Sequence, residues 1–290
     1  MKFPDNNPPL MNNTDNGWTD CYYPADGGYN PLERLAYMRK RFWNVTGGNV
    51  LGRGFLPTQV TNTMYPENQI FTYGNVVHII VNVVGSNNGY YDNKDKSCNT
   101  YINQVDPSCN QSNTEFHARD AAVNTLVMEG FQRAKDSNIM AVMLYFQGDL
   151  FNGPCGGPQT NPACKTTPSG CACCDITQPI QVSSGFINFW DTIVTGAQNF
   201  AGQVVMVHGD FHHFQIFPEP GGVKNLLSVM VPGNMDVGWI EADITASIGS
   251  IPTFSFQMYD NNPNYNYYAN CPNNPDLKYF NVTDAFPPSR

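Results

Sequence analysis

The sequence predicts an α/β protein in which sheets carry helices on their outer faces. Two observations support this prediction. In the middle of the chain, buried-looking strands alternate with amphipathic helices. In the last third, short runs are apolar or alternate apolar with polar residues, which is typical of antiparallel strands. The chain has 290 residues and no segment that looks like an interdomain linker, so we expect one domain with appended segments.

Helices are predicted where apolar residues recur at helical spacing. The segments with this pattern are residues 31–43, 114–136 and 184–200. Pro31 suits the first position of the first helix, and Asn113 or Thr114 can cap the second. Arg119 and Asp120 lie near the start of that second helix. They form either a structural ion pair or a contact with the strand ends.

Strands are predicted where β-branched and aromatic residues form short runs. These runs are residues 76–84, 139–146, 203–207, 226–231, 239–245 and 253–259. The first ends in Gly85-Ser-Asn-Asn-Gly89, which predicts a tight turn. His78 lies inside that strand, where a core histidine is more common than a ligand. Residues 260–290 are rich in Asn, Pro and Tyr, and we expect this tail to wrap a neighbouring molecule or its own domain.

Charge and composition favour an extracellular protein. The net charge is −9 with 15 Lys and Arg residues, which argues against nucleic acid or an anionic membrane as the main partner. Charged residues make up 13% of the chain, against about 25% in an average globular protein. The sequence contains no apolar run long enough to span a bilayer and no signal-peptide pattern. We therefore expect a secreted chain whose leader was removed or whose first segment is missing.

Nine cysteines also favour an oxidising location. The disulfide candidates are Cys21, Cys98, Cys109, Cys155, Cys164, Cys171, Cys173, Cys174 and Cys271. Five of them lie in the Gly/Pro/Thr-rich loop 152–176, where disulfides are favoured over zinc. Cys98 and Cys109 bracket a short segment and are expected to form a local bridge, and the odd number leaves one thiol free or joined to another chain. N-linked glycans are predicted at the sequons of Asn12, Asn44, Asn110 and Asn281.

The densest group of metal-binding side chains is His208-Gly-Asp-Phe-His-His-Phe214. It follows the apolar run 203–207, so these side chains are expected at the end of a buried strand. Imidazole and carboxylate together suit zinc, iron or manganese. The alternative is that Gly209-Asp210 forms a turn while the histidines pack in the core or face solvent.

Several motifs occur in a distinctive order. They are Asn16-Gly-Trp-Thr-Asp-Cys21, Gly28-Tyr-Asn-Pro-Leu-Glu-Arg-Leu35, Pro66-Glu-Asn68, Val83-Val-Gly-Ser-Asn-Asn88, Arg119-Asp-Ala-Ala122, Gln147-Gly-Asp149 and Val207-His-Gly-Asp-Phe-His-His-Phe214. In this order they resemble a poorly characterised branch of the calcineurin-like metallophosphoesterases. The resemblance implies a four-layer αββα sandwich, with two mixed β-sheets face to face and helices outside. It also implies a two-metal site at the strand ends, where a bridging hydroxide attacks a phosphate ester.

The resemblance also implies roles for single residues. The implied metal ligands are Asp15, Gln147, Asp210 and His212, with Asn16 near the substrate and His208 as a catalytic residue. The family's first ligand motifs, Asp-x-His and Gly-Asp-x-x-Asp, do not occur in residues 1–13. Gln147 stands where many members have a ligand histidine. Since a two-metal centre needs roughly four to six protein ligands with a bridging carboxylate, we expect no metal or one weakly held Zn, Fe or Mn ion.

These observations lead to two main functional hypotheses. The first is a secreted, N-glycosylated, non-catalytic protein whose degenerate phosphoesterase-type domain, residues 14–259, serves as a structural module. It self-associates through an N-terminal arm, residues 1–13, and the tail, residues 260–290, as a subunit of a surface layer or filament. The alternative is an active metal-dependent phosphoesterase acting on a small extracellular phosphate ester. A third possibility, a carbohydrate or ligand binder using exposed Tyr and Trp residues, ranks lowest.

Overall fold

The computed structural model describes the fold between the two ends of the chain, in eight segments. They are residues 15–43, 59–60, 64–91, 109–152, 181–210, 215–231, 238–260 and 279–281. The N-terminal arm, most of the loop 152–176 and most of the tail lie outside these segments, so the predictions that concern them stay predictions. The same applies to the proposed bridge from Cys98 to Cys109, because Cys98 lies outside the described residues.

The three predicted helices are all present. The described helices are α1 (Pro31–Met38), α2 (Gly85–Asn88), α4 (Asn110–Asp136) and α5 (Ile187–Gln198). Short 3-10 helices accompany them, namely η1 (Asp15–Gly17), η2 (Thr19–Tyr22), η3 (Pro24–Asp26), η5 (Ser184–Phe186) and η6 (Pro220–Gly222), and α1 continues into a π-helical turn, η4 (Arg39–Trp43). α1 begins as predicted, because Asn30 accepts hydrogen bonds from the backbone N–H groups of Leu32 and Glu33.

The predicted caps of the long helix were wrong. α4 begins at Asn110, and Cys109 occupies the N-cap position without a side-chain bond. The Asn113 side chain instead accepts from the Tyr91 N–H and donates to the Tyr91 carbonyl, at 2.9 and 3.0 Å. Thr114 donates to the Asn110 carbonyl inside the helix. A long-range backbone contact therefore uses the side chain that the local pattern assigned to capping.

The strands form two main sheets. They are β1 (Gln59–Val60), β2 (Gln69–Tyr73), β3 (Val76–Ile80), β4 (Ala141–Tyr145), β5 (Phe151–Asn152), β6 (Gln181–Val182), β7 (Gln203–His208), β8 (Gln215–Pro218), β9 (Leu226–Met230), β10 (Gly238–Thr245), β11 (Thr253–Asp260) and β12 (Tyr279–Asn281). The larger sheet has the order β1-β2-β3-β4-β7-β9-β8, and the smaller has the order β10-β11-β12. β5 and β6 pair separately.

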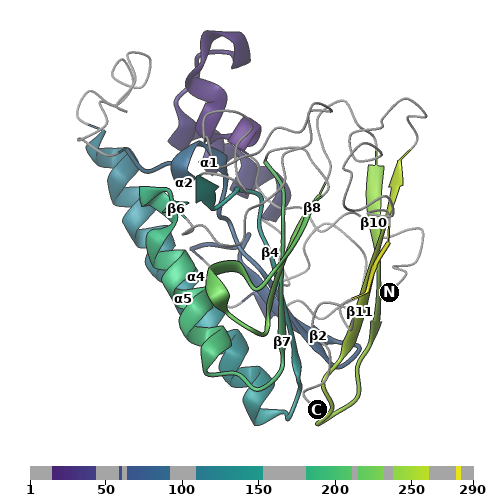
Figure 1. Cartoon of the computed structure of the whole chain (residues 1–290). Helices are drawn as coiled ribbons and strands as arrows, with labels where there is room; N and C mark the ends of the chain where they lie inside the picture. Colours follow the sequence, from purple (N-terminus) through teal and green to yellow (C-terminus); the bar gives the residue numbers. More distant parts are fainter. Residues whose placement is uncertain are drawn as a thin grey trace.

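The larger sheet is mixed, with a parallel centre. β3, β4, β7 and β9 run parallel to one another, whereas β2 and β8 pair antiparallel at the two sides. Parallel strands are buried on both faces, which explains why these four segments are nearly continuous apolar runs. Their carboxyl ends all lie at one edge of the sheet. The N-terminal elements, purple in Figure 1, lie at the same end of the molecule as α2.

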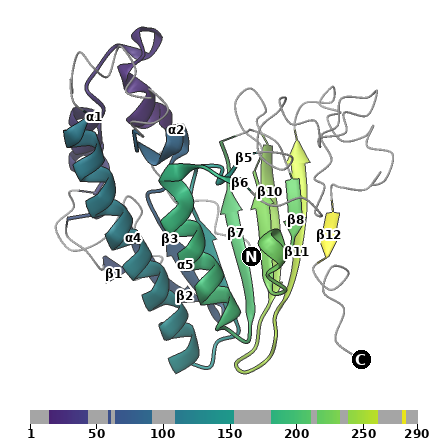
Figure 2. The same ribbon diagram turned by 60° about the vertical axis from the view of Figure 1, so that its left-hand side comes forward.

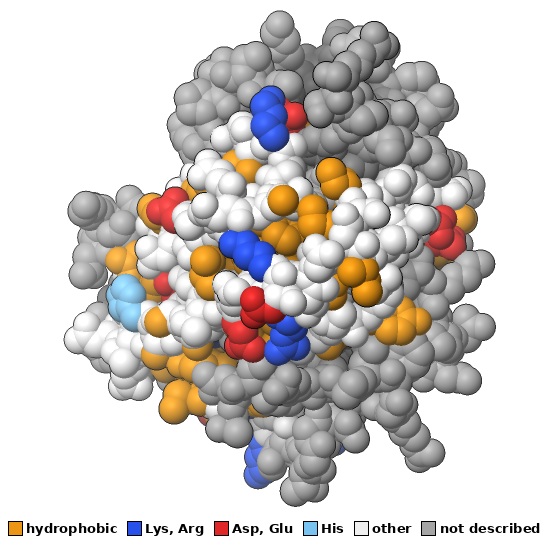
Figure 3. All heavy atoms as spheres, turned by 90° about the horizontal axis from the view of Figure 1, so that it is seen from below, with side chains coloured by type: hydrophobic (Ala, Val, Ile, Leu, Met, Phe, Trp, Pro, Cys, Tyr) orange, Lys and Arg blue, Asp and Glu red, His pale blue; other side chains and the backbone are white. Residues whose placement is uncertain are grey.

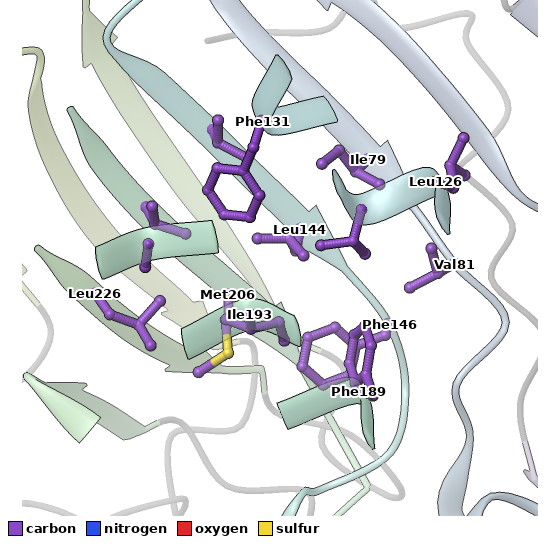
Figure 4. Packing of buried hydrophobic residues seen from close by; sticks show 14 of the residues in the cluster. Ile79, Val81, Leu126, Phe131, Leu144, Phe146, Phe189, Ile193, Met206 and Leu226 are labelled. Atoms are coloured by element: carbon purple, nitrogen blue, oxygen red, sulfur yellow. The ribbon is translucent and has the colours of Figure 1, made fainter. Parts of the chain in front are cut away.

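The described elements form three layers. α4 and α5 cover one face of the larger sheet, and β10 and β11 cover the other (Figures 1 and 2). The helical side buries the main core (Figure 4), whose labelled members are Ile79, Val81, Leu126, Phe131, Leu144, Phe146, Phe189, Ile193, Met206 and Leu226. The opposite side packs Met143, Val205 and Val229 against Phe254 and Phe256 of the second sheet. The α/β class is thus confirmed; the described residues contain no second helical layer outside β10 and β11.

His78 is a core residue, as the sequence favoured. It is fully buried in β3, and its ring stacks between Phe71 and Tyr145. Its Nδ1 lies 2.9 Å from the Tyr145 hydroxyl, and its Nε2 lies 3.3 Å from the Tyr73 carbonyl oxygen. Burial lowers its pKa to about 4. The ring is therefore neutral at neutral pH and fills the interior.

One described piece of the tail returns to its own chain. β12 pairs antiparallel with β11 and so becomes the third strand of the smaller sheet. The alternative in which the tail wraps its own domain therefore holds for these three residues.

The surface carries few charges, in keeping with the composition. Basic and acidic side chains are scattered among neutral ones on the face shown in Figure 3. In the part of the chain that the structure describes, no helix combines the length and apolar character that crossing a membrane requires.

Candidate functional site

Three side chains meet at the carboxyl edge of the larger sheet. Gln147 follows β4 and Asp210 follows β7, and Asp15 reaches them from η1. The Gln147 Nε2 donates to Asp15 Oδ1 and to Asp210 Oδ1, both at 3.2 Å. We refer to Asp15, Gln147 and Asp210 as the Asp–Gln–Asp cluster. The ends of parallel strands lie at one edge of a sheet, which brings Gln147 and Asp210 together, and η1 adds Asp15; the two aspartates lie 63 and 132 positions from Gln147 in the sequence.

Gly85 lets the two carboxylates lie directly on the backbone after β3. A Cβ atom at this position would lie 2.6 Å from Asp210 Oδ1 and 2.7 Å from Asp15 Oδ2. No side chain larger than a hydrogen atom fits there without moving the carboxylates. The Asp149 N–H also donates to Asp210 Oδ2, at 3.3 Å. The backbone of two loops thus shapes the cluster.

Asp210 binds a proton under mildly acidic conditions. Burial, the negative charge of Asp15 and a hydrogen bond between the two side chains together raise the pKa of Asp210 to about 6. Two carboxylates in contact cannot both ionise without mutual repulsion. The proton and the amide of Gln147 together reduce that repulsion.

The orientation of Gln147 is determined by a backbone bond. The Gly85 N–H donates to Gln147 Oε1 at 2.6 Å, so the amide nitrogen is the atom that faces the carboxylates. Gln147 therefore offers the two aspartates hydrogen-bond donors. To bind a metal through Oε1, it would have to give up the bond from Gly85.

His208 does not face the cluster. Its ring is buried and stacks on Phe146, with ring centroids 5.4 Å apart. Its Nε2 lies 2.7 Å from Ser228 Oγ, and its Nδ1 lies 4.0 Å from Asp149 Oδ1. Burial lowers the pKa of His208 to about 4 and raises that of Asp149 well above its ordinary value. The residue that the resemblance made catalytic is here a neutral core side chain.

The other predicted site residues are placed only in part. Asn16 lies in η1 beside Asp15, but its side chain is not described. His212 lies outside the described residues, so its role as a ligand stays a prediction. Among the predicted glycan sites, Asn110 is exposed at the first position of α4. Of the disulfide candidates, Cys21 and Cys109 are described, and both are buried.

The turn behind the cluster is the short element α2, and its backbone is unusual. Ser86, Asn87 and Asn88 all have positive φ, between 53° and 57°, although such angles are uncommon outside glycine. Asn88 donates to the Gly185 carbonyl at 3.2 Å, and the Gly185 N–H donates to Asn87 Oδ1 at 2.8 Å. The Ser86 hydroxyl donates to Asp20 of η2. Contacts with segments far apart in the chain therefore hold this left-handed turn.

Arg119 is the side chain that fixes the turn. Of the two alternatives that the sequence left open, it makes the contact with a strand end, because it reaches the segment after β3, whereas Asp120 accepts from Asn188 Nδ2 at 2.9 Å. Arg119 is fully buried, and its guanidinium donates to the Asn82 carbonyl, to Asn88 Oδ1 and to the Asn88 carbonyl, at 2.8, 2.6 and 2.7 Å. Its charge is balanced by Glu115 on the same helix. Its guanidinium carbon lies 5.0 Å from the centre of the Trp18 ring. One arginine thus links α4, the turn and the N-terminal segment.

A second buried group continues this network. Glu67 is 2% exposed, accepts from Arg39 Nε at 2.9 Å and accepts from Asn82 Nδ2 at 3.0 Å. Asn68 Oδ1 accepts from the Asn82 N–H at 2.7 Å. Asn82 interrupts the apolar run 76–84, and a polar residue inside such a run is a sequence signal that could have indicated this network, although the network was not predicted. Four of the motifs in the resemblance, at residues 16–21, 66–68, 83–88 and 119–122, therefore meet in this network.

Comparison with known proteins yields no family. No family model matches the chain, and no curated protein matches it either. The phosphoesterase resemblance stays a hypothesis, and the function must be argued from the site.

The cluster provides fewer metal ligands than a two-metal centre needs. Two carboxylates suit a divalent cation that prefers oxygen ligands, but Gln147 presents its amide nitrogen to them. A two-metal centre needs more ligands, and no group of three or more His, Cys, Asp or Glu side chains comes together within the described segments. An imidazole from His212 would be a further ligand. The described residues alone therefore supply half or less of the ligand set of a two-metal phosphoesterase.

Proposed function

We propose that this chain is a secreted, N-glycosylated structural protein whose phosphoesterase-type domain is not catalytic and whose copies self-associate. The four-layer αββα sandwich belongs to the same proposal. The observation that carries the non-catalytic part is the hydrogen bonding of Gln147. Its amide nitrogen contacts both Asp15 and Asp210, and its oxygen is already used by the Gly85 N–H.

Hydrogen bonds within the Asp–Gln–Asp cluster reduce the repulsion between its two carboxylates. In a metal enzyme, a divalent cation balances converging carboxylates. Here two amide N–H groups, and below the pKa of Asp210 at about 6 a proton on that carboxyl, reduce the repulsion between Asp15 and Asp210. A cation would have to displace that proton and reorient Gln147 before it could bind. This competition lowers the affinity for metal at any pH near or below the pKa of Asp210, about 6.

The same bonds serve a structural purpose. They tie η1 to the ends of β4 and β7, while Arg119 ties η2 and the turn to α4 through Trp18 and Asn88. The N-terminal segment is thus held to the sheet by polar contacts as well as by the packing of Trp18 and Leu35. A durable scaffold needs these contacts whether or not it performs chemistry.

Metal content and phosphatase activity test this proposal. Elemental analysis of the purified native protein, with its intact mass after deglycosylation, is expected to show well below one equivalent of Zn, Fe or Mn. Hydrolysis of a generic aryl phosphate is expected to stay at the level of the Asp210→Asn variant. Asp191→Asn, an exposed change on α5, is the matched control. Close to two equivalents of metal, or hydrolysis that Asp210→Asn abolishes and Asp191→Asn retains, would overturn the proposal.

Self-association is tested separately. Sedimentation velocity of the native protein over a wide concentration range is expected to show species larger than the monomer. A monomer at every concentration would refute the assembly part and leave the metal result unaffected.

The alternative function, a metal-dependent phosphoesterase, has one observation in its favour. Asp15, Gln147 and Asp210, which the resemblance named as ligands, do come together at the strand ends. In that case Asp15 and Asp210 would hold the metal with His212, and Gln147 would have to turn its oxygen inward. The metal would activate water and polarise the phosphate ester. The variant Gln147→His separates the two functions, because it raises metal affinity if the metal site is intact and has no effect on it if the site serves only structure.

A further inference from the structure

The C-terminal strand β12 occupies an edge that a second copy of the chain can also fill. Tyr279, Phe280 and Asn281 pair with Gln257, Phe256 and Ser255 of β11. On its other side β11 pairs with β10 along eight residues. We call the side of β11 that faces β12 the acceptor edge. In the single chain, the acceptor edge is filled by the chain's own strand.

The acceptor edge has a reason to be filled. Phe256, at its centre, is 1% exposed and belongs to the core between the two sheets. An open edge here would leave backbone N–H and C=O groups of β11 without strand partners, which favours pairing with another chain. A strand that covers this edge gives those groups partners, and Tyr279–Asn281 does so opposite Ser255, Phe256 and Gln257.

The connection to β12 is much longer than the pairing requires. β11 ends at Asp260 and β12 begins at Tyr279, so 279 − 260 − 1 = 18 residues separate them. Since Tyr279 lies opposite Gln257, a hairpin loop of about two to five residues would be enough to return the chain. A connection of this length spans up to about 60 Å when it is extended. The strand can therefore reach the acceptor edge of a neighbouring molecule.

We propose that the C-terminal strand is exchanged between copies, so that β12 of one molecule fills the acceptor edge of the next. This inference rests on the proposed self-association and names its contact. The hydrogen bonds and the register of β12 on β11 are the same within one chain and between chains. The balance between the two arrangements therefore depends on protein concentration and on the entropy of the 18-residue connection between β11 and β12. The donor strand and the acceptor edge are different surfaces, so the contact is heterologous and repeats from molecule to molecule.

Photo-crosslinking of the full chain tests the exchange. Two versions of the chain, each with a photoreactive phenylalanine analogue at position 280 and each with a different affinity tag, are expressed together. After irradiation and denaturation, products are captured by one tag and probed for the other. With random exchange, about half of the interchain products carry both tags, and their crosslinks map to β11. The analogue at Tyr37, an exposed residue of α1, is the control and is expected to give no crosslink to β11.

The outcomes separate this inference from the proposed function. Products with both tags, mapped to residues 253–260, support the exchange. Crosslinks confined to single chains in a protein that still assembles overturn the exchange and leave self-association standing. A protein that is monomeric by sedimentation and crosslinks only within single chains overturns both.

A variant provides an independent measurement. Phe280→Pro removes a backbone donor and disfavours strand pairing. We expect it to weaken self-association at least tenfold while the thermal unfolding of the domain is nearly unchanged. Unaltered assembly of Phe280→Pro would overturn the exchange.

Discussion

Replacing Arg119 with Met tests whether one buried guanidinium holds the carboxyl edge of the sheet together. The side chain is fully buried and donates three hydrogen bonds of 2.6 to 2.8 Å to oxygens of Asn82 and Asn88. Methionine has a similar length but no donor, so these acceptors lose their partner. A hydrogen bond from a charged group contributes about 1.5–3 kcal/mol, and the bonds of one network are not additive. We expect the free energy of unfolding to fall by about 3–5 kcal/mol.

Arg133→Met is the matched control. Arg133 lies on the same helix and pairs with Glu129 four residues earlier, at 3.1 Å, as Arg119 pairs with Glu115. Its side chain is 25% exposed, and such exposed pairs contribute about 0.3–0.5 kcal/mol. We expect a loss of no more than about 0.5 kcal/mol.

Urea unfolding followed by tryptophan fluorescence measures both variants, since Trp18 lies against the Arg119 guanidinium. If Arg119→Met loses no more stability than Arg133→Met, the turn is held by other contacts and the reasoning is refuted.

The remaining predictions use the same unfolding assay. Gly85→Ala should lower the free energy of unfolding by about 1–3 kcal/mol, because its Cβ would lie 2.6 Å from Asp210 Oδ1. The control Gly209→Ala, whose Cβ would lie 3.5 Å from its nearest neighbour, should lower it by less than about 1 kcal/mol. Equal losses in the two variants would contradict the close approach of the carboxylates to Gly85. Burial lowers the pKa of His78 to about 4, so the unfolded chain binds a proton that the folded chain does not, and stability falls as the pH drops from about 6.5 to 4. In His78→Phe, the fall in the free energy of unfolding over this pH range should be smaller by about 2–3 kcal/mol. An unchanged pH dependence would show that the buried imidazole is not its cause. The pKa of Asp210 is raised to about 6, so its protonated form stabilises the fold below about pH 4 and this contribution is lost as the pH rises through 6. Relative to Asp210→Asn, the wild type should therefore lose about 1–2 kcal/mol between pH 4 and pH 7, after allowing for partial exposure; a difference that is constant with pH contradicts this.

The sequence predicted the three longer helices and the strands β3, β4, β7, β9, β10 and β11, because their apolar periodicity matches the layers that they join; it did not predict β2 or β8. The run 76–84 is buried because β3 is covered by α4 on one face and by the second sheet on the other. The core position of His78 followed from the same pattern. Helix boundaries were less accurate. Asparagine is a common capping residue, but the side chain of Asn113 bonds the backbone of Tyr91 instead of capping the helix. A local sequence pattern cannot show this contact, because Tyr91 lies outside the helix.

The site was predicted only in part. The resemblance named Asp15, Gln147 and Asp210, and these side chains meet, but the same reasoning made His208 catalytic. The alternation of side chains along β7 indicates instead that His208 is a core residue. His208 lies on the same face of the strand as Val204 and Met206, which pack beneath the helices. The role of Arg119 could not be predicted from local sequence. Its partners lie 31 and 37 positions away, and only the fold brings them together.

The left-handed turn at Ser86–Asn88 connects three segments that lie far apart in the sequence. Three consecutive residues with positive φ are uncommon outside glycine, and Arg119, Asp20 and Gly185 contact the turn and stabilise it. These partners belong to α4, η2 and η5. We expect the loss of any one of these contacts to weaken the other two. The amides of η2, of the turn and of η5 should then share one opening free energy in hydrogen exchange, although 66 to 98 residues separate the turn from the segments on either side.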